Sequence, residues 1–87
     1  MKIRTAVREN EGNTYRYELN LTKGKAGEWK YSVRITLRSA DGSISTEAER
    51  EIFGRESMVK CFFERLVKEL VTPIDLPYVI EDEMCVH

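Results

Sequence analysis

Three features of the sequence predict an α+β fold. We expect a four-stranded antiparallel meander, with one amphipathic helix packed across one of its faces and a short C-terminal helix. Four segments in the N-terminal part alternate apolar and polar residues with the period of a β-strand. Turn-forming residues separate these segments. Residues 57–71 then repeat apolar residues at helical spacing. We expect one domain over residues 1–87, with the sheet in 1–53 and helices at 57–71 and 75–85.

The first two strands are predicted on either side of a turn at residues 10–13, Asn-Glu-Gly-Asn. In the first strand, Ile3, Thr5 and Val7 alternate with Lys2, Arg4, Ala6 and Arg8, so we expect these three to face the core. In the second strand the inward residues are Tyr15, Tyr17, Leu19 and Leu21. Pairing Val7 with Tyr15 keeps these apolar residues on one face of the sheet and places Arg4 beside Glu18 on the other.

A basic loop at 22–28 leads to the third strand, with Leu21 predicted opposite Trp29. This strand has the clearest alternation, with Trp29, Tyr31, Val33, Ile35 and Leu37 directed inward. Asp41-Gly42 is a strong hairpin signal, and a two-residue turn there leads into a fourth strand at about 43–52. The resulting register sets Leu37 opposite Thr46, Ile35 opposite Ala48 and Tyr31 opposite Ile52. On the outer face it sets Thr36, Arg34 and Ser32 opposite Glu47, Glu49 and Glu51, with Arg50 inward on an edge strand.

The helix predicted over 57–71 has a broad apolar stripe that must be covered by the sheet. The stripe consists of Met58, Val59, Phe62, Phe63, Leu66, Val67, Leu70 and Val71. Glu56 favours the start of the helix, and Glu56/Lys60 and Glu64/Lys68 have the spacing of stabilising ion pairs. Thr72-Pro73 ends the helix. Asp75 can cap the short second helix, whose residues Leu76, Val79, Ile80 and Met84 are expected to face inward.

The charge of this sequence is unevenly distributed along the chain. Residues 1–38 hold nine Lys/Arg against four Glu, whereas residues 39–87 hold five against eleven acidic residues. The basic residues of the strands form a candidate interaction surface on the outer face of the sheet, made of Arg4, Arg8, Arg16, Lys30, Arg34 and Arg38. Such a surface could follow a phosphate backbone. The pI near 5.9, the Glu47/Glu49/Glu51 row and the inward strand aromatics disfavour nucleic acid as the partner.

The sequence shows no set of residues that predicts catalysis, a cofactor or a metal, so we expect no enzyme. The single histidine, His87, is the last residue and cannot be held in a catalytic geometry. Cys61 and Cys85 are too few for a disulfide framework and are expected as reduced thiols. With His87 they lack the fourth ligand and the spacing of a zinc site. Glu81-Asp82-Glu83 is expected to be a solvated helix end, because consecutive carboxylates point in different directions.

These features favour a small protein that acts without a membrane. No apolar run approaches the length of a membrane span and no signal-peptide pattern follows Met1, so a cytoplasmic location is expected. The leading hypothesis is a non-enzymatic protein–protein interaction module that binds an unknown protein or self-associates through a free strand edge. Nucleic-acid binding through the outer face is the alternative. A small-ligand binder with a pocket between helices and sheet is the third class.

The C-terminal stretch from Thr72 to Asp82 resembles the closing motif of a family of small uncharacterised proteins from clostridia-like bacteria. Those chains have a strand-rich N-terminal half, an amphipathic helix and a Pro-x-x-Leu-x-x-Val-x-Glu-Asp ending. The matching residues here are Pro73, Leu76, Val79, Glu81 and Asp82. The resemblance implies the same fold and no activity.

Overall fold

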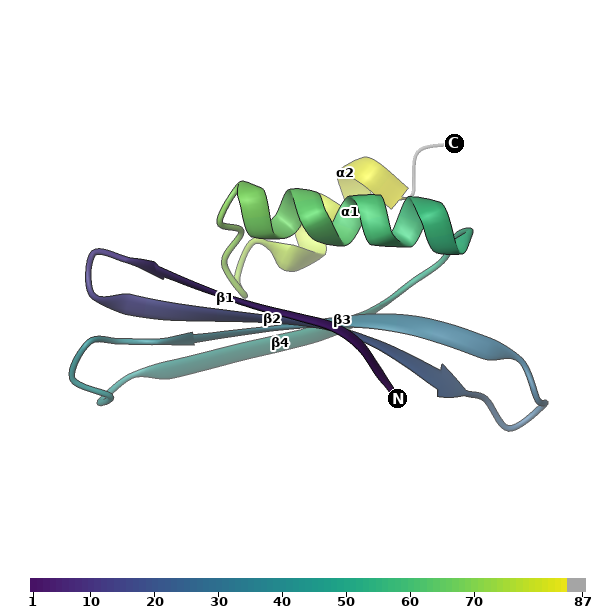
Figure 1. Cartoon of the computed structure of the whole chain (residues 1–87), viewed down its shortest axis with the longest axis horizontal. Coiled ribbons are helices and arrows are strands. Elements are labelled where there is room, and N and C mark those ends of the chain that lie inside the picture. The colour runs from purple at the N-terminus through teal and green to yellow at the C-terminus, as the bar shows by residue number, and fades with distance from the viewer. Residues whose placement is uncertain (85–87) are drawn as a thin grey trace.

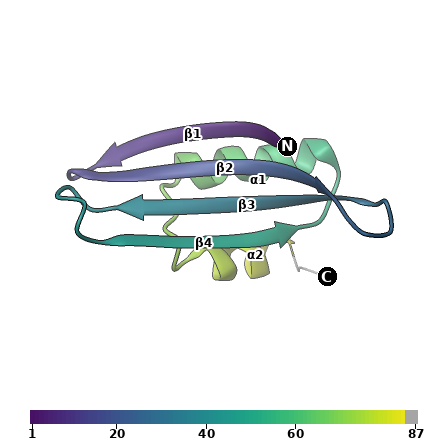
Figure 2. The same cartoon turned by 90° about the horizontal axis from the view of Figure 1, so that it is seen from below.

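The structure, a computed structural model, describes residues 1–84 and has the predicted α+β architecture (Figure 1). Four strands form one antiparallel sheet in the order β1-β2-β3-β4, and both helices lie on the same face of it (Figures 1 and 2). The strands are β1 (Lys2–Asn10), β2 (Asn13–Lys23), β3 (Trp29–Arg38) and β4 (Ser45–Ile52), and the helices are α1 (Glu56–Lys68) and α2 (Leu76–Met84). Within the described residues, no helix lies on the other face of the sheet (Figure 1).

The core lies between the sheet and α1, as the apolar stripe predicts. Its buried residues are Tyr15, Tyr17, Leu19, Val33, Ile35 and Ile52 from the sheet, Val59, Phe62, Phe63 and Leu66 from α1, and Val71 and Leu76. Val67, Leu70, Val79 and Ile80 pack against this cluster and are partly buried. Met58 departs from the expectation, because its side chain is 55% exposed in the first turn of α1. The side chain of Met84 lies outside the described part of the chain.

The register of β3 and β4 is confirmed at all six predicted pairs, from Leu37 opposite Thr46 to Tyr31 opposite Ile52. The turn that sets it is longer than the two-residue turn expected. Gly42, with φ of +75°, donates its backbone N–H to the Ser39 carbonyl, and the Ser39 N–H bonds to Ile44. The loop therefore spans residues 40–43 and leaves the register unchanged.

The Asp41 carboxylate organises this loop by accepting three hydrogen bonds. The Ser43 hydroxyl, the Ser43 backbone N–H and the Ser39 hydroxyl all donate to its Oδ1, at 2.7, 2.9 and 2.9 Å. These bonds stabilise the ionised form and lower the pKa of Asp41 to about 2.

A lowered carboxyl pKa makes the stability advantage of Asp41 dependent on pH. The unfolded chain binds the proton near pH 3.8, so the contribution is complete above that value and is lost as pH falls toward 2. We expect wild type to be more stable than Asp41→Asn at pH 6, with the difference shrinking between about pH 4 and pH 2. Urea unfolding across that range measures it. A difference that stays constant with pH would show that ionisation of Asp41 is not involved.

The register of β1 and β2 differs from the prediction by one residue. Val7 lies opposite Arg16, and Tyr15 lies opposite Arg8. The cause is the turn, which contains only Glu11 and Gly12, with φ of 54° and 83°. Two residues with positive φ form the tight hairpin turn that matches strand twist, whereas the predicted pairing needs a third loop residue. This shift of one residue turns the side chains of residues 4–9 to the face opposite the predicted one.

Glu11 occupies a backbone conformation that disfavours most side chains, which gives a direct test of this turn. We expect Glu11→Asn to raise the free energy of unfolding by roughly 1 kcal/mol, because asparagine tolerates the left-handed region and Asn-Gly is the preferred pair at such turns. Glu11→Ala removes the same carboxylate but keeps the unfavourable conformation, so it should give no gain. Thermal unfolding of both variants measures the effect. Equal stabilisation by both would assign it to charge.

The β2–β3 register is shifted by two residues, so its faces stay as predicted. Leu21 lies opposite Tyr31, and Lys23, not Leu21, lies opposite Trp29. Strand β2 extends two residues further than expected, to Lys23, because the loop closes over residues 24–28, where the Gly24 N–H bonds to the Glu28 carbonyl. Trp29 lies on the helix-facing side at the far end of the sheet and remains 59% exposed, with the Lys23 ammonium 5.9 Å from its ring centroid.

Helix α1 ends at Lys68, three residues before the predicted end. Leu70 takes a left-handed conformation with φ of 55°. The Val71 N–H bonds back to the Leu66 carbonyl and the Leu70 N–H to that of Val67, which closes the helix with a Schellman arrangement. The buried Val71 carbonyl then accepts the Tyr17 hydroxyl at 2.9 Å, and burial raises the Tyr17 pKa to about 12.

The segment before α2 is fixed by reciprocal bonds between Thr72 and Asp75. The Asp75 N–H donates to the Thr72 hydroxyl, which donates to the Asp75 carboxylate. Pro73 lies in this turn and Pro77 in the first turn of α2, where a missing N–H costs little. Asp75 thus precedes α2 as predicted. The residues of the predicted helix beyond Met84 lie outside the described part of the chain.

Candidate interaction surfaces

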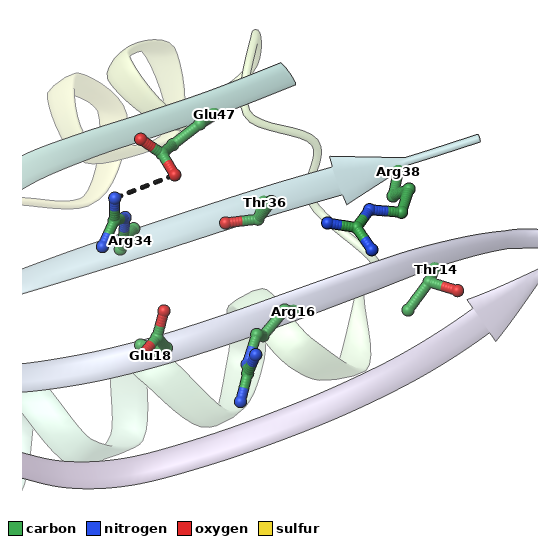
Figure 3. A pocket seen from close by; sticks show the side chains of 7 residues that line it. All are labelled: Thr14, Arg16, Glu18, Arg34, Thr36, Arg38 and Glu47. Carbon is green, nitrogen blue, oxygen red and sulfur yellow. Dashed lines mark ion pairs between the residues drawn. The ribbon is translucent and has the colours of Figure 1, made fainter. Parts of the chain in front are cut away.

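The uncovered face of the sheet, here called the outer face, contains a concavity of about 350 Å³ (Figure 3). Side chains from β2, β3 and β4 line it: Thr14, Arg16, Glu18, Arg34, Thr36, Arg38 and Glu47. The register explains the pattern, because Thr14 lies opposite Arg38 and Arg16 opposite Thr36. Arg16 and Arg38 therefore each have a threonine as the direct neighbour on the adjoining strand and lie diagonal to each other, whereas Arg34 lies opposite Glu18.

Ion pairs neutralise part of this concavity. The Arg34 guanidinium lies 2.9 Å from Glu47, and this contact raises the pKa of Arg34 (Figure 3). Glu49 lies directly opposite Arg34 as predicted, but the ion pair is made diagonally with Glu47. The Lys2 ammonium lies 2.7 Å from Glu18 and lowers the pKa of that carboxyl, so Lys2 holds the place predicted for Arg4.

The structure places only four of the six predicted surface residues on the outer face. Arg16, Lys30, Arg34 and Arg38 lie there, and Lys30 lies 3.7 Å from Glu28. Arg4 and Arg8 lie opposite Leu19 and Tyr15, whose side chains face the helices. The prediction that Arg4 and Arg8 belong to the outer face is wrong, because the two-residue turn shifts β1 by one residue.

Arg4 and Arg8 instead connect the sheet to α1. The Arg4 guanidinium bonds to the Glu64 carboxylate, which replaces the predicted Glu64/Lys68 pair. The predicted Glu56/Lys60 pair does form, at 3.7 Å. The Arg8 Nη1 donates to the carbonyls of Val67 and Lys68, each at 3.0 Å. These are carbonyls of the last helical turn, where a cation is favoured by the helix dipole.

Moving two arginines away leaves the strand residues of the outer face electrically balanced. The register places five basic and five acidic side chains there: Lys2, Arg16, Lys30, Arg34 and Arg38, and Glu9, Glu18, Glu47, Glu49 and Glu51. A surface of this composition exerts little net attraction on a polyanion. The outer face is therefore a mixed-charge surface.

A second candidate surface lies along β1, which is one edge of the sheet. Asn10 and Asn13 flank the two-residue turn and form a hydrogen-bonded pair, so Asn10, Arg8, Ala6 and Arg4 direct their backbone groups toward β2. The N–H and C=O groups of Thr5, Val7 and Glu9 consequently point away from the sheet. Val7 is also 56% exposed on the outer face. The alternating pattern of β1 by itself placed Val7 on the wrong face. The sequence signal that could have corrected this is the short Glu11-Gly12 turn, which sets the register of β1.

A groove of about 380 Å³ lies beside this edge, between β1 and α1. Ala6, Phe63 and Val67 supply apolar surface, and Arg4, Thr5, Glu64 and Lys68 complete its lining. An extended segment paired with β1 would direct alternate side chains toward this groove.

The opposite edge, β4, is obstructed. The hydrogen bond from Ser39 to the Ile44 carbonyl marks that pair as bonded, so by alternation Glu47, Glu49 and Glu51 direct their backbone groups outward. The Arg50 side chain, directed inward by register as predicted, donates to the Glu49 carbonyl at 2.8 Å. A charged side chain over an edge carbonyl and a row of carboxylates discourage further pairing. Helix α2 lies on the β4 side of the sheet (Figure 2).

The remaining sequence candidates are cysteines, the histidine and C-terminal carboxylates. Cys61 is a free, exposed thiol on α1, and Cys85 and His87 lie outside the described residues. Among residues 1–82, whose side chains the structure describes, no group of three His, Cys, Asp or Glu side chains could hold a metal. Glu81 and Asp82 are exposed, as expected for a solvated helix end.

The chain belongs to DUF6514, a family of unknown function whose model matches residues 1–86. The predicted resemblance to a family without a known activity is confirmed at that level, and the clostridial origin and the C-terminal motif stay predictions. No curated protein and no solved structure matches the chain. Within the described residues, no helix has the length and apolar character needed to cross a membrane.

Proposed function

We propose that this member of a family of unknown function is a non-enzymatic protein–protein interaction module that works in the cytoplasm. The observation that carries the proposal is the β1 edge, where the backbone groups of Thr5, Val7 and Glu9 point outward beside the groove against α1. A row of unpaired backbone donors and acceptors next to an apolar groove is the geometry by which a sheet binds an extended chain. Main-chain pairing and side-chain insertion then act together.

The contrast between the two edges supports a specific use of β1. Arg50 caps an outward carbonyl of β4, and the glutamates surround the others. On β1, the nearby arginines are engaged elsewhere: Arg4 with Glu64, and Arg8 with the end of α1. Neither obstructs the edge. The fold thus leaves one edge open to a protein chain.

Site-specific photocrosslinking tests this proposal. A benzoylphenylalanine placed at Val7 should yield protein adducts in native lysate, and the same residue at Glu49, on the obstructed edge, should yield few. Both positions direct side chains to the outer face, so the matched pair separates edge binding from general stickiness. Equal adducts from both positions, or none from Val7, would contradict the proposal.

Nucleic-acid binding, the alternative from the sequence, makes a separate prediction. It requires binding that weakens steeply with salt and is lost in an Arg34→Glu, Arg38→Glu variant. The balanced outer face leads us to expect no salt-dependent binding of single-stranded DNA or RNA. Fluorescence anisotropy at low ionic strength measures it. Tight, salt-sensitive binding would favour nucleic acid over a protein partner.

A further inference from the structure

We propose that the partner at the β1 edge is a second copy of this chain, joined by antiparallel β1–β1 pairing about a two-fold axis through Val7. The two four-stranded sheets would then form one continuous sheet with the helices of both copies on the same side. The inference rests on the proposed function as an interaction module, and it identifies the partner.

The choice of β1 follows from the two edges. Pairing β4 with another β4 brings two rows of glutamates together, because Glu47, Glu49 and Glu51 all accompany the outward backbone groups of that strand. Pairing β1 with β4 of another copy requires displacement of Arg50 from the Glu49 carbonyl. Self-pairing of β1 meets neither obstacle. It also closes the assembly as a dimer, since each copy offers one open edge.

Like charges disfavour three alternative registers of the two β1 strands. Outward backbone groups must meet outward groups, so the pairs form among Thr5, Val7 and Glu9. Placing Thr5 opposite the partner's Val7 sets Arg4 against the partner's Arg8, and placing Val7 opposite the partner's Glu9 sets Arg8 against the partner's Arg8. Placing Glu9 opposite the partner's Glu9 opposes two carboxylates. Like charges directly opposite each other are destabilising.

The register centred on Val7 avoids these conflicts. Val7 lies opposite the partner's Val7, and Thr5 lies opposite the partner's Glu9, so all three outward residues are paired. On the helix side, Arg8 lies opposite the partner's Ala6, and Arg4 lies opposite the partner's Asn10. The most exposed apolar side chain of β1 is thereby covered, since Val7 is 56% exposed in the single chain.

Helix α1 adds complementarity at the same axis. Arg4 binds Glu64, and Arg8 bonds to the Lys68 carbonyl. Along the direction of β1, Glu64 therefore lies on the Arg4 side of Val7 and Lys68 on the Arg8 side. A two-fold axis through Val7 reverses this order in the second copy. Glu64 therefore lies toward the partner's Lys68, and Lys68 toward the partner's Glu64. Both residues line the groove that the dimer would enclose.

Variants that place a positive or a negative charge at Val7 test the dimer and its register. We expect the wild type to sediment as a dimer, and Val7→Lys and Val7→Glu to sediment separately as monomers, with the dissociation constant raised by about a hundredfold or more by opposed like charges. An equimolar mixture of the two variants should recover the dimer. The Glu49→Lys variant, changed on the obstructed edge, should still sediment as a dimer like the wild type. Circular dichroism confirms that each variant is folded.

The outcomes separate this inference from the proposed function. A wild type that stays monomeric up to high micromolar concentration, or a dimer that persists in Val7→Lys and in Val7→Glu, would overturn β1 self-pairing. Failure of the mixed variants to associate would overturn the register centred on Val7. If the Val7 photocrosslinker captures a different protein while the chain stays monomeric, the interaction module stands and the self-pairing fails.

Discussion

Replacing Leu66 by alanine should lower the free energy of unfolding by about 3 kcal/mol, a large effect for a chain this small. Leu66 is 1% exposed on the face of α1 that packs against the sheet, and its carbonyl accepts the Val71 N–H that closes the helix. Truncation removes buried apolar surface and leaves a cavity that the neighbouring phenylalanines Phe62 and Phe63 can fill only in part. Urea unfolding with linear extrapolation measures the difference.

Met58→Ala is the matched control on the same helix. Methionine and leucine lose similar apolar volume on truncation, but Met58 is 55% exposed, so its loss should stay within about 0.5 kcal/mol. Comparing Leu66→Ala with Met58→Ala tests whether the predicted apolar stripe is buried along α1 but exposed in its first turn. A cost for Met58→Ala near that of Leu66→Ala would mean that another surface covers Met58, such as a partner.

Replacing Arg8 by alanine should lower the free energy of unfolding by about 2 kcal/mol. The Arg8 guanidinium donates to the carbonyls of Val67 and Lys68 in the last turn of α1, where carbonyls lack the i+4 backbone donor of the helix interior. The substitution removes two charge-assisted hydrogen bonds and a cation from the negative end of the helix dipole. Amide hydrogen exchange should show faster opening of the last turn of α1, alongside the loss measured by urea unfolding.

Arg16→Ala provides the comparison for Arg8→Ala. Arg16 lies on the outer face opposite Thr36, with no ion pair to the residues that the structure describes, so its loss should cost less than about 0.5 kcal/mol. The sequence pattern treats these two arginines alike, as solvent-facing residues of alternating strands. Equal costs for the two variants would contradict the observed register of β1.

Most of the fold was predictable because burial requires strict periodicity. The alternation in β3, the apolar stripe of α1 and the Asp41-Gly42 signal predict a sheet packed against a helix and the β3–β4 register. The β3–β4 register was predicted correctly although the observed turn contains four residues and not two, because turns of both lengths give the same strand pairing. The predicted β2–β3 register was wrong by two residues, but each side chain was still assigned to the correct face, since strand side chains repeat every second residue.

The candidate surface was less predictable, and β1 shows why. Ile3, Thr5 and Val7 alternate with three basic residues and Ala6, so the sequence alone favours an inner face made of these three residues. In the structure a register shift between Lys2 and Arg4 lets Ile3 pack against the core, while Thr5 and Val7 face outward. Arg4 and Arg8 can lie on the helix side because α1 offers them a carboxylate and two carbonyls of its last turn as hydrogen-bond acceptors.

The sequence by itself determined the α+β class, the order of the elements and most residues of the core, because apolar periodicity and turn residues act over short distances along the chain. The tertiary structure alone decided which arginines reach solvent, which edge of the sheet is open and how α1 is held at its C-terminal end. These features depend on the one-residue register of β1 and on partners about 60 residues away in the chain, such as Glu64 for Arg4 and Lys68 for Arg8. Local patterns carry no record of contacts at that separation.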